Sequence, residues 1–348
     1  PKLTCFASMR LITALCILSF LWGCTPTDTA VSSSYHDTTG RTDILSGGVR
    51  MIPISTPKGE FKVWTKRTGN NPTIKVLLLH GGPGITHEYF EACDSYFPGA
   101  EIEYYYYDQL ESHYSDHPND TSLWNIPHFV EEVEQVRIAL GLDTSNFYLY
   151  GNSWGGILGI EYALKYQQNL KGLIVANMVS SIPHYNQYAN EVLAPQLPAE
   201  VLEEIKQLEA AQDYLNPRYS QLLNEHYYTA HILRMPLDEW PDGVNRAFEH
   251  INYPLYLDIQ GPSEFGIVGD AKLQGWDRSG DLPKIKVPTL VIGAKYDTMD
   301  PEHMEWMSTQ FPAGEYLYCP NGSHLAMYDD QEIFFNGLIK WIKEVDGS

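Results

Sequence analysis

Short apolar runs alternate with helical patterns along most of the chain from Gly59 onward. Runs rich in β-branched, aromatic and leucine residues predict buried strands, and apolar residues recur at helical spacing between them. The predicted strands are Phe61–Thr65, Lys75–Leu79, Glu103–Tyr107, Phe147–Tyr150, Leu173–Ala176, Thr289–Ile292 and Tyr316–Tyr318. The predicted helices are Pro127–Leu140, Trp154–Tyr166, Pro301–Gln310 and Gln331–Val345. This alternation is typical of an α/β fold with a mostly parallel sheet flanked by helices.

The alternation is interrupted between residues 181 and 280, where helical patterns, Pro and Tyr occur without a convincing strand. One helix is predicted there at Ala199–Tyr214. We interpret residues 181–280 as a helical cap inserted into an α/β core formed by residues 43–180 and 281–348. Ligands bind at the carboxyl ends of the strands in such folds, so we expect the cap to cover that edge of the sheet.

The first 24 residues are predicted to be a signal peptide and not part of the fold. Lys2 and Arg10 give a positive start, and the apolar run 11–23 is shorter than the ~20 residues that a membrane-spanning helix needs. The run ends at Leu21–Cys24, which resembles a bacterial lipoprotein processing site, so Cys24 is the expected point of lipid attachment. A plain secretory signal is the alternative. The lipoprotein prediction places the protein on the periplasmic or outer face of a bacterial envelope.

Residues 25–42 are rich in Ser, Thr and Asp, which predicts a flexible tether. The chain has 44 acidic and 23 basic residues and a formal charge of −21, which argues against nucleic acid or anionic lipid as the main partner. Membrane contact is expected only through the N-terminal lipid. In the predicted folded region the cysteines are Cys93 and Cys319, expected to be free and buried, and no Cys or His cluster has metal-ligand spacing. We therefore predict no metal site.

The turn Gly151–Gly155 has the pattern Gly-x-Ser-x-Gly, and its serine is a candidate nucleophile. The turn joins a predicted strand to a predicted helix, and this context is that of a nucleophile elbow. Glycines are needed because neighbouring backbone comes too close for a Cβ, and the central serine is held in a strained conformation. Ser153 is therefore the candidate nucleophile, placed where the amino end of a helix favours developing negative charge.

A serine hydroxyl is a poor nucleophile near neutral pH and needs a base that a third group holds in place. In folds with a nucleophile elbow the acid and then the histidine follow the serine along the chain. Asp297 and His324 each come just after one of the last two predicted strands, so both are expected at the sheet edge that carries Ser153. Asp300 is the alternative acid.

The Gly-rich segment His80–Gly84 follows another predicted strand. A bend of this kind frees backbone N–H groups to face an oxyanion, and glycines such as Gly81 let a substrate approach closely. We predict that the N–H groups of Gly82 and Trp154 form the oxyanion hole. A phosphate-binding loop is disfavoured because no Gly-Lys-Ser/Thr ending is present. His80 is expected to support the loop and not to react.

Together these motifs resemble the proline iminopeptidases of the α/β-hydrolase fold. The segments that carry the resemblance are His80–Gly84, Tyr107–Leu110, Gly151–Gly156, Gly261–Phe265, Asp297 and Gly322–His324. The resemblance implies an exopeptidase without a cofactor, which releases an N-terminal residue, often proline, from short peptides through an acyl-enzyme. It also implies that Ser153, Asp297 and His324 form the catalytic triad and that Glu264 binds the substrate's ammonium group.

The chain departs from the family's pattern at two places. Some relatives have a second glutamate directly after the catalytic aspartate, where this chain has Thr298, and Glu111–His113 stands where a glycine and a small residue are usual. With one carboxylate missing, an esterase or amidase acting on small uncharged acyl substrates is the alternative function. Glu225 is a further candidate ligand of the ammonium group, although a solvated acid is expected there. A peptide-binding lipoprotein without activity is disfavoured by the complete catalytic set.

Overall fold

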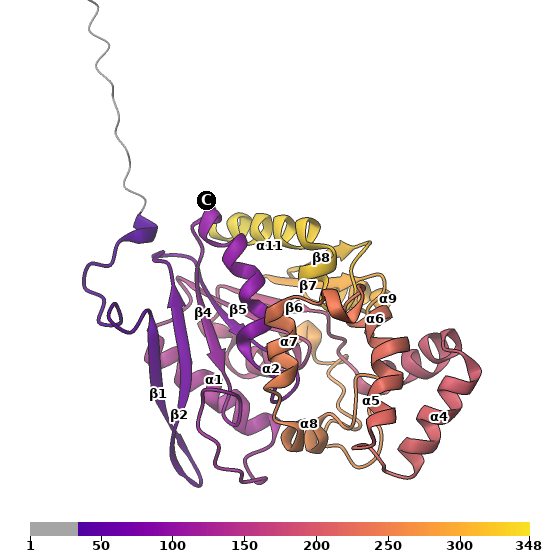
Figure 1. Ribbon diagram of the computed structural model, residues 1–348. Helices are drawn as coiled ribbons and strands as arrows, with labels where there is room; N and C mark the ends of the chain where they lie inside the picture. Colours follow the sequence, from indigo (N-terminus) through magenta and orange to yellow (C-terminus); the bar gives the residue numbers. More distant parts are fainter. Residues whose placement is uncertain (1–33) are drawn as a thin grey trace, which may run out of the picture. The chain divides into compact units, whose positions relative to one another are not determined.

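The computed structural model describes residues 34–348. The predicted signal peptide and the predicted lipid-bearing Cys24 lie outside the described residues. The described part contains one eight-stranded sheet (Figure 1). Its strands are β1 (Val49–Thr56), β2 (Gly59–Thr68), β3 (Lys75–Leu79), β4 (Glu103–Asp108), β5 (Phe147–Asn152), β6 (Gly172–Ala176), β7 (Thr289–Ala294) and β8 (Gly314–Cys319).

The strands are arranged in the order β1-β2-β4-β3-β5-β6-β7-β8. The pairs β1–β2 and β2–β4 are antiparallel, and every pair from β4–β3 to β7–β8 is parallel. The carboxyl ends of the six strands from β4 to β8 therefore meet at one edge of the sheet. All seven predicted strands are confirmed, and with them the mostly parallel α/β fold.

Strand β1 was not predicted, and its sequence explains why. Its pattern includes Pro53, which cannot donate a hydrogen bond to a sheet and argues against a central strand. The structure places β1 at the edge of the sheet, where a proline is tolerated, with Pro53 opposite Lys62 of β2. Ile52 and Ile54 alternate with exposed neighbours and pack into the core.

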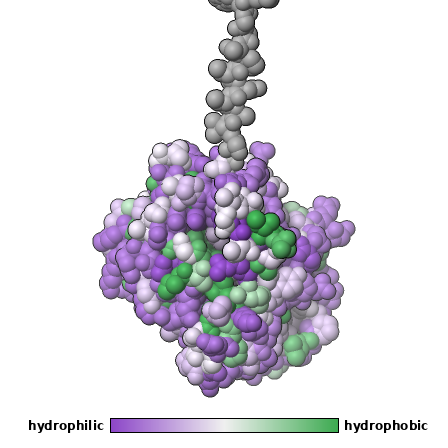
Figure 2. Space-filling model, turned by 90° about the vertical axis from the view of Figure 1, so that its left-hand side faces the viewer, coloured by the Kyte–Doolittle hydropathy of each residue, from purple (hydrophilic) through white to green (hydrophobic). Residues whose placement is uncertain are grey.

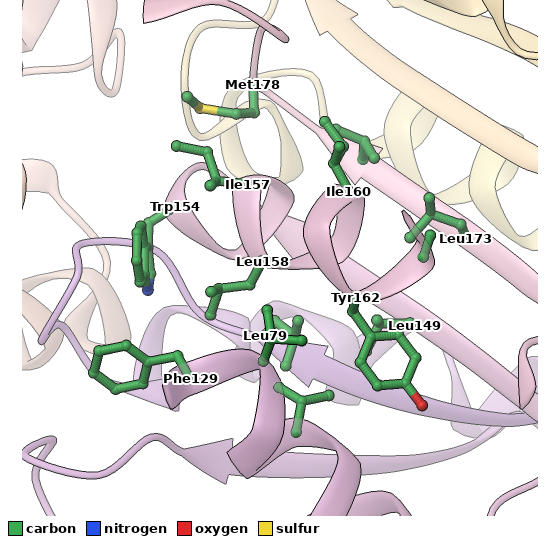
Figure 3. Packing of buried hydrophobic residues seen from close by; sticks show 14 of the residues in the cluster. Leu79, Phe129, Leu149, Trp154, Ile157, Leu158, Ile160, Tyr162, Leu173 and Met178 are labelled. Carbon is green, nitrogen blue, oxygen red and sulfur yellow. The ribbon is translucent and has the colours of Figure 1, made fainter. Parts of the chain in front are cut away.

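Helices cover both faces of the sheet. The predicted helices are confirmed as α1 (Ile126–Leu140), α2 (Trp154–Tyr166), α9 (Pro301–Gln310) and α11 (Gln331–Asp346). Strand side chains alternate between two hydrophobic clusters: Tyr105 packs in the cluster with α1, α2 and α9, and Tyr104 packs in the cluster with α11. Figure 3 shows part of the first cluster, where Leu79 and Leu149 from strands lie among Leu158, Phe129 and other helix residues.

Residues 181–280 contribute helices but no strand to the sheet. The α-helices are α3 (Ile182–Tyr188), α4 (Ala199–Ala210), α5 (Pro217–Leu223), α6 (Thr229–His231), α7 (Asp242–Glu249) and α8 (Tyr253–Ile259). In Figure 1, α4 and α5 lie together beside the sheet. They share a small core of their own, built around Ile205, Leu222 and Tyr227. The predicted helix Ala199–Tyr214 was too long, because Gln212 adopts a left-handed conformation (φ 54°) that ends the helical path after Ala210.

The predicted tether 25–42 also extended too far. Among its described residues, Tyr35 is buried and packs against Gly69, where an added Cβ would lie 2.3 Å from the tyrosine ring. Arg41 forms an ion pair with Asp43 at 2.8 Å. Tyr35 therefore anchors this otherwise largely exposed segment to the core, and the polar composition of the segment concealed the buried aromatic side chain.

The face shown in Figure 2 is largely hydrophilic, and its apolar residues form separate patches. Within residues 34–348 no helix is long and apolar enough to cross a membrane. Cys93 and Cys319 are free and buried, as predicted.

Candidate active site

Ser153 stands at the tight turn between β5 and α2. Its backbone has φ 55° and ψ −127°, a strained conformation for a residue with a side chain. A Cβ on Gly151 would lie 2.0 Å from the carbonyl oxygen of Gly155, and a Cβ on Gly155 would lie 2.1 Å from that of Leu79. The two glycines are therefore required by close backbone contacts. The Ser153 N–H donates to the carbonyl of Ala176 in the neighbouring strand at 3.0 Å, which fixes the turn to the sheet.

The predicted acid and base meet at the carboxyl edge of the sheet. Asp297 follows β7 and His324 follows β8, and His324 Nδ1 lies 2.7 Å from Asp297 Oδ1. The Asp297 side chain is fully buried, and His324 and Ser153 line the same cavity. The structure thus brings together the three residues that sequence reasoning selected.

Asp297 is held in place by further donors. Its Oδ1 accepts the N–H of Met299 at 3.1 Å, and its Oδ2 accepts the side-chain amide of Asn177 at 2.7 Å. Asn177 directly follows β6 and has a left-handed φ of 54°, and its amide also donates to the carbonyl of Ser323 at 3.2 Å. Sequence reasoning missed Asn177, although its place directly after a buried strand was a usable signal.

Two further residues lie near Asp297: Asp300, the alternative acid, and Thr298, which stands where some relatives have a second glutamate. Asp300 caps α9 through the N–H of Glu302 at 2.9 Å and lies 2.7 Å from His184 Nε2. The Thr298 hydroxyl lies 3.3 Å from both Asp297 Oδ1 and His324 Nδ1. Asp300 therefore does not orient His324, and Thr298 contacts the Asp–His pair.

The charge environment favours a proton on His324. Burial alone lowers the pKa of the imidazole, but the negative charge and hydrogen bond of Asp297, together with the charge of Glu264, outweigh it. The net result is a pKa above the usual 6.5. Because Nδ1 faces Asp297, Nε2 is the nitrogen left to exchange a proton with Ser153.

The Gly-rich loop after β3 is shaped by hydrogen bonds from His80. Its Nδ1 donates to the Gly81 carbonyl at 2.9 Å, and its Nε2 accepts the Gln109 N–H at 3.1 Å. The Gln109 side chain donates to the His80 carbonyl at 3.1 Å and accepts from Trp154 Nε1 at 2.9 Å. His80 therefore supports the loop, as predicted. Sequence reasoning did not foresee that Gln109 links the loop to the helix after the nucleophile.

The predicted oxyanion donors lie on this loop and on the first turn of α2. Gly82 has φ 104°, and a Cβ there would lie 2.7 Å from the backbone nitrogen of Ile85. A Cβ on Gly81 would lie 3.0 Å from Ser153 Cβ, so the loop passes directly beside the serine. The Trp154 N–H is the first of its helix, and such groups have no acceptor within the helix. Gly82 also lines the cavity with Ser153.

Residues 181–280 complete the cavity and supply Glu264 to it. Glu264 is buried, and its Oε1 accepts the hydroxyl of Tyr256 at 2.6 Å. Its Oε2 has no hydrogen-bond partner among the described residues. Burial is the main cause that raises the pKa of this carboxyl above its ordinary value, opposed by His324 and the Tyr256 hydrogen bond. The Tyr185 hydroxyl donates to the Glu264 carbonyl at 2.6 Å and fixes the backbone.

Glu225 does not belong to this cavity. It is exposed within the segment 181–280 and accepts the side-chain amide of Gln221 at 2.9 Å. This agrees with the solvated acid that we expected.

Comparisons with known proteins identify the family of the chain. The family model of the alpha/beta hydrolase fold matches residues 75–331. The chain is 59% identical over 298 residues to a proline iminopeptidase of Chitinophaga pinensis, which covers 86% of this chain and 99% of that protein.

The chain is also similar to proteins of known structure. The crystal structure of the proline iminopeptidase of Mycobacterium smegmatis matches with a TM-score of 0.73 and 27% identity, over 86% of this chain and 98% of that one. A thermophilic esterase from Thermogutta terrifontis matches with a TM-score of 0.59 and 19% identity, over 85% of this chain and 99% of that one, and shares the fold alone. On this sequence identity and fold, the chain belongs to the proline iminopeptidase family of α/β hydrolases.

Proposed function

We propose that the protein is a serine aminopeptidase that releases an N-terminal proline or a similar residue from short peptides. The observation that carries this proposal is the unpartnered Oε2 of Glu264, buried in the cavity that Ser153 and His324 also line. A buried carboxylate oxygen without a donor is costly, and a substrate ammonium group would satisfy it. The names of the relatives support the same activity.

The reaction follows from the positions of the side chains. Ser153 Oγ attacks the carbonyl carbon of the first residue while His324 Nε2 takes its proton, and Asp297 stabilises the imidazolium. The N–H groups of Gly82 and Trp154 stabilise the oxyanion. His324 then gives the proton to the leaving amine, which departs as the shortened peptide and leaves an acyl-enzyme. Water, deprotonated by His324, hydrolyses the ester and frees Ser153.

Substrate selection combines charge with an apolar pocket. An N-terminal ammonium group would pair with Glu264, and this fixes the carbonyl of the same residue near Ser153. The other walls of the cavity are largely apolar and include Ile85, Phe248, Ile251 and Leu325. They suit a small apolar ring or side chain, as in proline.

Replacing Glu264 by glutamine should separate charge recognition from chemistry. We expect kcat/KM for a proline anilide with a free amine to fall about 100-fold, since an ammonium ion loses its charged partner. Hydrolysis of an uncharged acyl ester should change less than about threefold. Steady-state kinetics on both substrates measures the difference, and Glu225→Gln, which changes an exposed cap glutamate, serves as the matched control.

Equal losses on both substrates would contradict the role given to Glu264. The second candidate function, an esterase or amidase for uncharged acyl compounds, is favoured by Thr298, which leaves Glu264 without a companion carboxylate. That function would be supported if N-acetylated anilides reacted as fast as those with a free amine.

We further propose that the protein is exported and anchored in a bacterial envelope through a lipid on Cys24. The support is the sequence alone: a positive start, the apolar run 11–23 and the segment Leu21–Cys24. Radiolabelled palmitate should be incorporated into the wild-type protein made in a bacterial host and should be absent from Cys24→Ala. Label that persists in the variant would remove the proposed anchor.

A further inference from the structure

Three potential metal ligands from separate parts of the chain converge outside the catalytic cavity. They are Glu88 on the 3-10 helix His87–Ser95, His113 in the loop after β4, and His250 at the end of α7. One ligand atom from each lies within 4.8 Å of the others. Glu88 Oε2 is 2.7 Å from His250 Nδ1, and Glu88 Oε1 is 3.8 Å from His113 Nε2.

The cluster is incompletely satisfied by protein groups. His113 Nε2 is buried and has no hydrogen-bond partner among the described residues. The His113 and His250 rings stack with centroids 4.2 Å apart and an interplanar angle of 16°. A buried ring nitrogen without a partner costs free energy unless a proton donor, a water molecule or a metal ion satisfies it.

The local charge permits a further cation. Arg246 contacts the carboxylates of Glu88, Glu91 and Asp242. Three carboxylates against one guanidinium leave two negative charges in excess. Arg246 contacts Oε1 of Glu88, and Oε2 accepts the Thr86 hydroxyl at 2.9 Å and lies 2.7 Å from His250 Nδ1. A metal ion would take the place of the proton between Oε2 and His250.

We propose that Glu88, His113 and His250 bind one divalent transition-metal ion, with Zn²⁺ the best match. Two imidazoles and one carboxylate form a known zinc ligand set, and a fourth position would remain for water. Ligands about 2.0–2.1 Å from a tetrahedral ion lie about 3.3 Å from one another. In the structure Glu88 Oε2 is 2.7 Å from His250 Nδ1, and the other carboxylate oxygen, Oε1, is 3.8 Å from His113 Nε2. Coordination would require the stacked rings to rotate until both nitrogens direct their in-plane lone pairs at one ion.

Such a site would join the helical insert to the sheet domain. His250 belongs to the segment 181–280, whereas Glu88 and His113 belong to the core. Two residues further along, the Asn252 N–H donates to the Gly84 carbonyl at 2.8 Å, and its side chain donates to the Glu111 carbonyl at 2.9 Å. A bound ion would reinforce this contact beside the catalytic cavity, which Ile251 lines.

The sequence predicted no metal site because the three ligands are far apart in the chain, so no short spacing marks them. Glu111 and His113 have left-handed φ values of 70° and 36°. The segment Glu111–His113 stands where the family that the sequence resembles usually has a glycine and a small residue. The departure noted in the sequence thus supplies one of the ligands.

The test is metal binding by the tag-free protein after treatment with a chelator. Titration with Co²⁺, followed by its visible absorption, and equilibrium dialysis with Zn²⁺ should show one ion per chain. His250→Gln should weaken Zn²⁺ binding by about 100-fold or more, since it removes a direct ligand. The matched control His226→Gln changes an exposed cap histidine and should bind like the wild type.

Metal binding is measured without catalysis. A negative result for metal binding is therefore distinct from a failure of the proposed aminopeptidase activity. Saturating Zn²⁺ should raise Tm of the wild type and not that of the variant. If His250→Gln does not fold, His113→Asn replaces it, because asparagine tolerates a left-handed backbone. No bound ion in the wild type, or unchanged affinity in the ligand variants, would overturn the proposal.

Discussion

Replacing Ser153 by alanine is expected to lower kcat/KM for a proline anilide by about 10⁴- to 10⁶-fold. Alanine has no hydroxyl to form the acyl-enzyme, and the residual rate comes from binding and the oxyanion donors alone. The fold should persist, since alanine carries a Cβ like serine and adds no strain at φ 55°. Steady-state kinetics and the melting temperature, measured together, separate lost chemistry from lost structure.

Covalent labelling is an independent test of Ser153 as the nucleophile. An organophosphonate should label the wild-type protein at Ser153 and leave Ser153→Ala unlabelled. Ser220→Ala, which changes an exposed serine of the cap, should keep both activity and labelling. Labelling at another residue, or a loss of activity smaller than tenfold, would remove Ser153 as the nucleophile.

Replacing Asp297 by asparagine is expected to lower kcat about 10⁴-fold, as loss of the triad acid does in other serine hydrolases. Asparagine would place an amide group against His324 Nδ1 instead of a carboxylate. The imidazole would then lose the tautomer in which Nε2 is free to accept the serine proton. Asp300→Asn is the matched control, because asparagine also caps helices and Asp300 contacts His184 instead of His324. We expect less than a tenfold change for it, measured with the same substrate.

The pH dependence of kcat/KM is a second test of the role of Asp297. Catalysis needs a neutral His324, so the rate is lost as the pH falls through the pKa of the imidazole. Because that pKa is raised, the acidic limb of kcat/KM for the wild type should lie above pH 6.5. Without the charge of Asp297, burial dominates and the limb of Asp297→Asn should move to lower pH. An unmoved limb, or equal losses in the two variants, would contradict the assignment.

The fold was predictable where the local pattern agrees with the tertiary structure. Buried parallel strands are continuous apolar runs, and all six of them were found from the sequence, together with the antiparallel strand β2. The errors occurred where one residue changes the pattern. Pro53 concealed the edge strand β1, the left-handed Gln212 shortened a helix, and Tyr35 anchors a segment with a polar composition.

The candidate site was predictable to the extent that its residues stand in recognisable turns. Ser153, Asp297 and His324 each follow a strand, and parallel strands bring such positions together. Supporting residues such as Asn177 and Gln109 act through hydrogen bonds between distant segments, which no spacing rule encodes. The same limit applies to Glu88, His113 and His250, whose proximity exists only in three dimensions.

The origin of Glu264 in the segment 181–280 has an evolutionary consequence. The serine, the acid and the histidine are encoded on either side of that insert, and the carboxylate expected to select the substrate is encoded within it. A gene rearrangement that exchanges the insert would change which molecules are admitted while preserving every bond-making group. Selectivity in such a lineage can therefore change while the reaction chemistry stays the same.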